Sequence, residues 1–184
     1  MKHQFQINKI LIPIDFSKTS KLALEHAAHL CKTFKSELHL LHITKNYTID
    51  VLPNLTATSA VLSNLEDLRG RVTDELNAIG KKFSEQHNVG YNIEVKGGSV
   101  ANGIIESAKD CKADLIVMGT HGVSGFEEFF IGSNAYRAVT SATVPVLTVQ
   151  EHSDKMGFEN IVLPIDSSNH TRDKVSEVVA LAKA

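Results

Sequence analysis

The chain has 184 residues, of which 42% are hydrophobic and 22% charged, the composition of an ordinary globular protein. One domain of about 150 residues plus a short remainder accounts for this length. The formal net charge is -2, so the composition offers no general attraction to nucleic acid or to anionic membranes. No apolar run approaches the about 18 residues of a membrane span and no signal peptide is recognisable, so we expect a cytoplasmic protein.

In chain order, short apolar runs alternate with segments of helical periodicity. The expected strands cover residues 10–14, 37–43, 91–95, 114–119 and 144–149, and the expected helices cover 19–34, 64–87, 100–111 and 133–141. This alternation favours an α/β fold: a doubly wound, Rossmann-like parallel sheet of five strands with helices on both faces. Residues 44–63 lack a steady period and contain a proline, which predicts a long connection after the second strand.

The two cysteines carry no metal or redox signature. Cys31 and Cys111 are far apart and form no Cys-x-x-Cys pair, so neither a thiol redox motif nor a four-cysteine zinc site is predicted, and both are expected to be buried. His26 and His29 lack an acidic third ligand, and His39 and His42 point to opposite sides of one strand. We therefore expect no structural metal site.

The C-terminal segment repeats the start of the chain. KILIPIDFSKTSKLALEHAAHLCK, residues 9–32, and NIVLPIDSSNHTRDKVSEVVALAK, residues 160–183, share Ile, Pro, Ile, Asp, Ser, Leu and Lys at matching positions. The repeat predicts a domain over 1–150, a linker over 151–159, and over 160–184 the strand (161–165) and helix that open an incomplete second repeat. Chance similarity between two strand-helix openings is the alternative.

The densest motif is MGTHGVSGFEEFFIGSNAYRAV, residues 118–139, which leaves an expected buried strand and enters an expected helix. Gly119, Gly122, Gly132, Ser133 and Asn134 form the pattern Gly-x2-Gly-x9-Gly-Ser-Asn. Glycines permit close backbone approach, and the start of a helix presents unpaired N–H groups and a positive dipole end. The motif therefore predicts an anion site, against the alternative of a plain turn with Ser133 as the helix cap.

These motifs together resemble the nucleotide-binding branch of the universal stress protein family. The resemblance is carried by ILIPIDFSKTSKLAL, ELHLLHI, ADLIVMGTHG and the glycine motif, and it covers residues from about 8 to 150. It implies a sheet of order 3-2-1-4-5, ATP (or ADP or AMP) bound across the carboxyl ends of the strands, and a homodimer or tandem pseudo-dimer through strand 144–149. The switch-point rule for doubly wound sheets also places a ligand at this edge.

The resemblance assigns a role to each matching residue. Adenine and ribose are flanked by Pro13, Ile14 and Asp15; the base touches Ile43; the floor is Met118 and Gly119; the phosphates meet Gly122, Gly132, Ser133 and Asn134, with His121 adjacent. For Asp15 a helix N-cap or an Asx turn is an alternative that needs no ligand.

The glycine loop carries Glu127 and Glu128 and no Lys or Arg between Gly122 and Gly132. Two carboxylates repel a triphosphate unless backbone N–H groups and a divalent cation offset the charge. We therefore expect Mg²⁺ or Mn²⁺, held by phosphate oxygens and water rather than by protein ligands.

The chain lacks the Gly-x4-Gly-Lys-Ser/Thr, kinase and Gly-x-Ser-x-Gly signatures. The leading hypothesis is therefore an ATP-binding regulatory or stress-response module with unidentified protein partners. The alternatives are a weak ATPase or autokinase that uses His121 or Asp15, and a nucleotide-independent dimeric scaffold.

Overall fold

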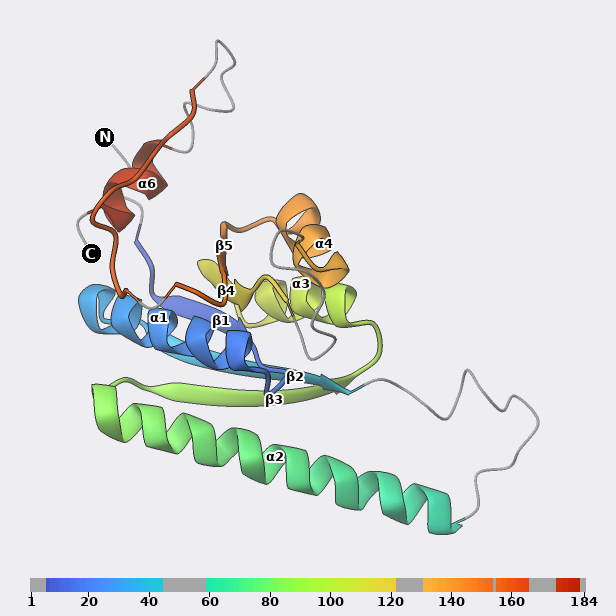
Figure 1. The fold of residues 1–184 in the computed structure, drawn as a ribbon. Coiled ribbons are helices and arrows are strands. Elements are labelled where there is room, and N and C mark those ends of the chain that lie inside the picture. Colours follow the sequence, from blue (N-terminus) through green and yellow to red (C-terminus); the bar gives the residue numbers. More distant parts are fainter. Residues whose placement is uncertain (1–5, 45–58, 122–130, 154, 166–174, 183–184) are drawn as a thin grey trace.

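The computed structural model describes residues 6–44, 59–121, 131–153, 155–165 and 175–182, with the side chains of 59–65 left aside. Its centre is a parallel sheet of five strands in the order β3-β2-β1-β4-β5 (Figure 1). The strands are β1 (Lys9–Pro13), β2 (Glu37–Thr44), β3 (Tyr91–Gly97), β4 (Leu115–Gly119) and β5 (Val146–Val149). This confirms the predicted fold class and strand order.

Each pair of consecutive strands is joined through one described helix. The connecting helices are α1 (Lys18–Phe34), α2 (Ser59–His87), α3 (Val100–Asp110) and α4 (Ser133–Ser141). Side chains of α1 and α2 share one hydrophobic core with the sheet, and those of α3 and α4 share the other. The helices therefore cover both faces of the sheet, as expected for a doubly wound fold.

The central strand β1 is buried on both faces. Ile10 and Ile12 belong to the core beneath α1 and α2, Leu11 belongs to the core beneath α3 and α4, and all three are inaccessible to solvent. Burial of each such side chain stabilises the fold by about 1.5–3 kcal/mol, so the end of β1 is a rigid platform.

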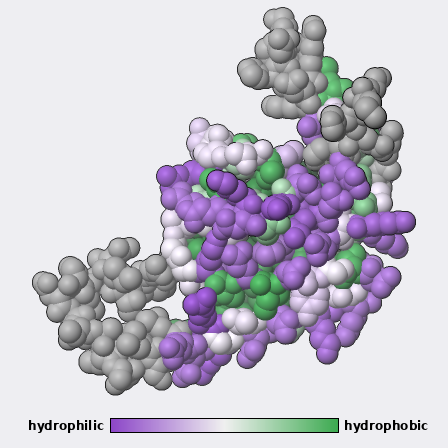
Figure 2. Space-filling model, turned by 180° about the vertical axis from the view of Figure 1, so that it is seen from behind, coloured by the Kyte–Doolittle hydropathy of each residue, from purple (hydrophilic) through white to green (hydrophobic). Residues whose placement is uncertain are grey.

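Seen from behind, the surface is mostly polar with scattered apolar patches (Figure 2).

Burial also decides the state of the cysteines. Cys31 is buried as expected, whereas Cys111 is half-buried. Burial, and to a smaller extent the charge of Glu37, raises the pKa of the Cys31 thiol to about 12. Cys31 is therefore an unreactive thiol in the folded chain.

Three element boundaries differ from the prediction by two residues or more: the start of α2, the start of β5, and the end of β3, which lies at Gly97 rather than 95. Helix α2 begins at Ser59, five residues before the expected start at 64, so residues 59–63 do not belong to the connection. Residues 45–58 of that connection lie outside the described residues. Strand β5 begins at Val146 rather than 144, because Pro145 has no N–H to donate; its carbonyl still accepts from the N–H of Ile116 at 3.0 Å.

The C-terminal tail departs further from expectation. Residues 160–165 form no strand, so the predicted strand over 161–165 is wrong for this structure, while α6 (Val175–Leu181) forms a short helix. A strand needs a neighbour for its N–H and C=O groups, and no described strand lies beside this segment. Val162 is accordingly 89% exposed, but Phe158 and Leu181 pack against the core beneath α1.

None of the described helices is long and apolar enough to span a membrane.

Candidate functional site

The predicted site residues lie at the carboxyl ends of the parallel strands. Strand β1 ends at Pro13, which pairs with Leu41, while β2 continues for three residues to Thr44. The strand order reverses at β1, since β2 lies on one side and β4 on the other. This is the topological switch point, where doubly wound sheets bind ligands.

The turn from β1 into α1 is closed by its own side chains. The Asp15 carboxylate accepts a hydrogen bond from the N–H of Ser17 at 3.0 Å, which is an Asx turn. Ser17 is the N-cap of α1, and its hydroxyl accepts from the N–H of Ser20 at 3.1 Å. One carboxylate oxygen of Asp15 therefore makes the Asx turn that the sequence allowed as an alternative to nucleotide binding.

Two residues assigned to the nucleotide direct their side chains into the cores instead. Ile14 is 2% exposed and belongs to the core beneath α1, and Met118 is 5% exposed and belongs to the core beneath α3 and α4. At Ile43, the terminal methyl would lie 2.7 Å from a Cβ on Gly103, so this side chain packs against α3. Main-chain groups, rather than side chains, are therefore what Ile14 and Met118 can offer to a ligand, whereas the side chain of Ile43 is only half-buried.

The end of β4 packs tightly against the start of α1. A Cβ on Gly119 would lie 3.0 Å from the Cβ of Thr19, so glycine here permits close contact between strand and helix. The Thr19 hydroxyl donates to the carbonyl of His121 at 2.5 Å. Thr19 thus joins the β1–α1 turn to the start of the glycine loop, a role that the sequence analysis missed because no local pattern marks it.

The glycine loop is closed at its base by backbone hydrogen bonds. The N–H of Thr120 donates to the carbonyl of Val149 at 2.9 Å, and the N–H of Gly132 donates to the carbonyl of Thr120 at 2.8 Å. A Cβ on Gly132 would lie 2.9 Å from that same carbonyl oxygen. Glycine at 132 therefore serves this backbone approach. Gly122, Glu127 and Glu128 lie outside the described residues.

Among the described residues, the start of α4 is open to an anion. Its N-cap is Gly132, no described side chain caps it, and its first turn contains no acidic residue. Ser133 is the first helical residue and not the cap, so the plain capped turn is not what forms here. Ser133 and Asn134 are both exposed. Their N–H groups and the positive end of the helix dipole can therefore meet a negatively charged group from solvent.

His121 combines one satisfied and one unsatisfied ring nitrogen. Its Nδ1 is hydrogen-bonded to the hydroxyl of Thr120 at 2.9 Å. Its Nε2 is buried and has no hydrogen-bond partner among the described residues. A buried polar atom without a partner is costly, so this nitrogen is available to a ligand group or to water.

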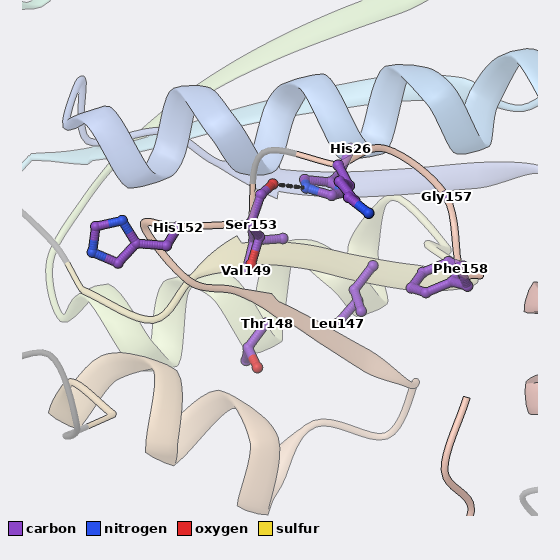
Figure 3. Close-up of a pocket in the computed structure, with 9 residues that line it drawn as sticks. His26, Leu147, Thr148, Val149, His152, Ser153, Gly157 and Phe158 are labelled. Carbon is purple, nitrogen blue, oxygen red and sulfur yellow. Dashed lines mark hydrogen bonds between the residues drawn. The ribbon is translucent and has the colours of Figure 1, made fainter. Parts of the chain in front are cut away.

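A separate groove of about 600 Å³ lies between α1, β5 and the following segment (Figure 3). It contains none of the predicted site residues; its lining is His26, Leu147, Thr148, Val149, His152, Ser153, Lys155, Gly157 and Phe158. Across it, the Nε2 of His26 donates to the carbonyl of Ser153 at 2.8 Å. The groove thus separates α1 from β5 and the segment that follows β5.

Among the described residues, no three His, Cys, Asp or Glu side chains form a group that could hold a metal ion.

The fold and the open helix start define a doubly wound α/β protein with a candidate anion site at the switch point of its sheet. The model of the universal stress protein family matches residues 6–150. The chain therefore belongs to the universal stress protein family.

Individual relatives agree with this assignment. The chain is 37% identical over 145 residues to universal stress protein MJ0531 of Methanocaldococcus jannaschii, which covers 78% of this chain and 82% of the relative. The structure of universal stress protein UspA from Lactobacillus plantarum matches with a TM-score of 0.68 and 22% identity, over 79% of this chain and 99% of that one. A universal stress protein from Archaeoglobus fulgidus, solved in complex with dAMP, matches with a TM-score of 0.53 and 13% identity, over 79% and 99%.

Proposed function

We propose that this chain is an ATP-binding universal stress protein that acts as a cytoplasmic regulatory module. The observation that carries the proposal is the start of α4: no described side chain caps its N–H groups, and Gly132 is hydrogen-bonded to Thr120 just after β4, next to the switch point of the sheet. The dAMP complex of the Archaeoglobus fulgidus protein supports the choice of an adenine nucleotide, because that protein has the same fold.

The proposed binding mode divides the nucleotide among three segments: the glycine loop with the start of α4, the end of β1, and the end of β2. The N–H groups of Ser133 and Asn134 bind phosphate oxygens, together with Gly122. The main chain of Pro13, Ile14 and Asp15 flanks the adenine and ribose. Ile43, which is half-buried near the end of β2, meets the base.

The metal of the proposed complex is held by the nucleotide. The described residues supply no cluster of carboxylates, so Mg²⁺ or Mn²⁺ would bind phosphate oxygens and water. Its chemical contribution is to offset the charge of the triphosphate. Removal of Mg²⁺ with EDTA should therefore weaken ATP binding more than AMP binding in calorimetry, and equal losses would contradict this part of the proposal.

The decisive variant is Ser133→Asp. An added negative charge at the start of α4 favours the helix through its dipole, yet it repels a phosphate at the same point. We expect ATP affinity to fall at least about tenfold, since a charge-assisted hydrogen bond contributes about 1.5–3 kcal/mol, while the melting temperature stays the same or rises. Calorimetry and thermal melting measure the two effects.

The matched control is Ser141→Asp, which places the same charge on an exposed residue at the opposite end of α4. It should lower stability slightly through the helix dipole and leave ATP affinity unchanged. The proposed function fails if the purified protein releases no nucleotide on denaturation and calorimetry shows no binding of ATP or AMP with Mg²⁺.

A second candidate function is slow ATP turnover, and one observation favours it: the buried Nε2 of His121 has no described partner. This nitrogen could accept a proton from an attacking water or hydroxyl. Steady phosphate release that disappears in His121→Ala, with ATP affinity retained, would establish it. Turnover unchanged in that variant would leave binding as the function.

Assembly and domain division belong to the same proposal. Strand β5 is the last strand of the sheet and has a described strand on one side only, so its outer edge is open to a second copy of the chain. Residues 160–184 are proposed to open a second repeat, on the sequence match to residues 9–32.

A further inference from the structure

The β1–α1 turn contains a residue in an uncommon backbone conformation. Phe16 has φ 64°, in the left-handed region that non-glycine residues rarely adopt. The other described non-glycine residues with positive φ are Lys35, Asn88 and Lys112, and all of them follow the ends of helices, where this conformation is common. Phe16 precedes a helix instead, so its conformation needs another cause, and surrounding contacts must hold it.

His42 supplies two of those contacts from the neighbouring strand. Its Nδ1 lies 2.7 Å from the carbonyl oxygen of Ile14. Because a carbonyl only accepts, Nδ1 carries the proton and donates, and it does so in both the neutral and the charged ring. The His42 ring also lies against the ring of Phe16, with centroids 5.0 Å apart and planes at 36°.

These contacts take over where the β1–β2 ladder stops. The last backbone bond of that ladder runs from the N–H of Ile14 to the carbonyl of Leu41, at 2.8 Å. The carbonyl of Ile14 then accepts from the side chain of His42. The peptide group that connects Ile14 to Asp15 is therefore oriented by His42, while Asp15 closes the other half of the turn by accepting from Ser17.

We propose that His42 is a positioning residue for the nucleoside: it holds the β1–α1 turn in the shape that adenine and ribose meet. The proposal rests on the proposed function, since it concerns the same site. His42 acts through Pro13, Ile14 and Asp15 and not through the phosphates, which lie at α4 in that binding mode.

Two substitutions separate the contacts of His42. His42→Phe keeps a ring beside Phe16 and removes the hydrogen bond, whereas His42→Asn keeps an N–H donor near the Nδ1 position and removes the ring. We expect His42→Phe to weaken ATP and AMP by the same factor, about fivefold to tenfold, as for loss of one hydrogen bond. His42→Asn should restore both affinities to within about twofold of the wild type, since the donor is retained.

The matched control is His39→Asn on the same strand. His39 faces the opposite side of the sheet, and its Nε2 lies 2.9 Å from the carboxylate of Glu94. This substitution should lower the melting temperature and leave both nucleotide affinities unchanged. A histidine that contributes only stability would behave in this way, so the comparison distinguishes positioning from general support of the fold.

The outcomes separate the inference from the function on which it rests. If the wild type binds neither ATP nor AMP, the proposed function fails. The role of His42 is overturned if the wild type binds and His42→Phe has the same affinities for ATP and AMP as the wild type. It is also overturned if His42→Phe loses affinity for ATP but not for AMP. If His42→Phe does not fold, His42→Leu decides by comparison with His42→Asn, because both remove the ring and only asparagine retains an N–H donor. His42→Leu should weaken ATP and AMP equally, and affinities equal to those of His42→Asn would overturn the inference.

Discussion

At the scale of single residues, the glycines of this chain have different physical roles. A Cβ at Gly132 would meet a backbone oxygen at 2.9 Å, whereas a Cβ at Gly70, in α2, would meet nothing within 4 Å. The first position therefore requires glycine for close approach, and the second is a helical glycine without a local reason. A substitution at Gly132 therefore disturbs the backbone of the loop whether or not a ligand is bound.

We predict opposite effects of alanine at these two positions. Gly132→Ala should lower the free energy of unfolding by about 1–3 kcal/mol, since the Thr120 carbonyl must move. Gly70→Ala should raise it by about 0.5–1 kcal/mol, because alanine favours an exposed helix. Urea unfolding of both variants measures the difference. Equal urea midpoints for Gly132→Ala and Gly70→Ala would show that the Thr120 carbonyl can move without an energetic cost.

Glu94 is expected to make stability depend on pH. Burial raises the pKa of its carboxyl, but hydrogen bonds from His39 and Lys96 outweigh burial and hold that pKa below its usual range. A group whose pKa is lowered on folding stabilises the fold above the unfolded pKa, about 4.3, and this stabilisation is lost as the pH falls through the folded pKa.

Glu94→Gln should therefore cost about 1 kcal/mol of unfolding free energy at pH 7, and the difference from the wild type should shrink as the pH falls below about 4. Urea unfolding across this range measures it. Glu159→Gln, which removes an exposed partner of Lys155, is the control and should change little. A cost for Glu94→Gln that is the same at every pH would contradict the role of its ionised form.

At the scale of elements, β5 has one edge paired with β4 and a second edge that no described strand pairs with. The carbonyls of Pro145 and Val149 accept from β4 and from Thr120, so backbone groups at these odd positions face the sheet. The backbone groups of Val146 and Thr148 alternate with them and face outward. An open edge of apolar, β-branched residues is a surface on which a second strand can pair.

Thr148→Pro tests pairing through this edge. Proline removes an outward N–H and leaves the ladder to β4 intact, and edge strands tolerate it for that reason. We expect the wild type to be a dimer by light scattering and the variant to be a monomer with a similar circular dichroism spectrum. An unchanged oligomeric state, whether dimer or monomer, would mean that β5 is not the contact.

At the scale of the whole molecule, the tail is tied to the domain by polar and apolar contacts. Lys18 pairs with Glu151 at 3.0 Å, and Ser153 accepts from His26 on the same helix. Phe158 then reaches the core beneath α1. The ion pair is exposed and contributes little, so the apolar contact carries most of the stabilisation.

Deletion of residues 157–184 should lower the free energy of unfolding by up to about 1.5–3 kcal/mol, the value for full burial of one aromatic side chain, since Phe158 is half-buried. Thermal melting measures this change, and light scattering shows whether assembly also weakens. Phe158→Ala in the full chain is the matched control and should reproduce most of the loss. If the shortened chain keeps its melting temperature and oligomeric state, the tail contributes to neither.

Local sequence patterns determined most of the architecture. Apolar runs of strand length and helices long enough for crossovers allow few arrangements other than a doubly wound sheet, and α4 begins and ends where its periodicity predicts. The glycine motif also located the candidate anion site, because glycine and helix-start residues act on the backbone next to them. Boundaries were least predictable where helix propensity continued into an expected loop, as at 59–63.

Tertiary structure decided which residues meet across the chain. Thr19 reaches His121, His42 reaches Ile14, and His26 holds the carbonyl of Ser153, contacts that span 102, 28 and 127 residues. Periodicity predicts the face on which a side chain lies, but its partner depends on how helices pack across strands. The same reason explains the tail: residues 160–165 have the sequence of a strand, yet a strand forms only where another strand offers it hydrogen bonds.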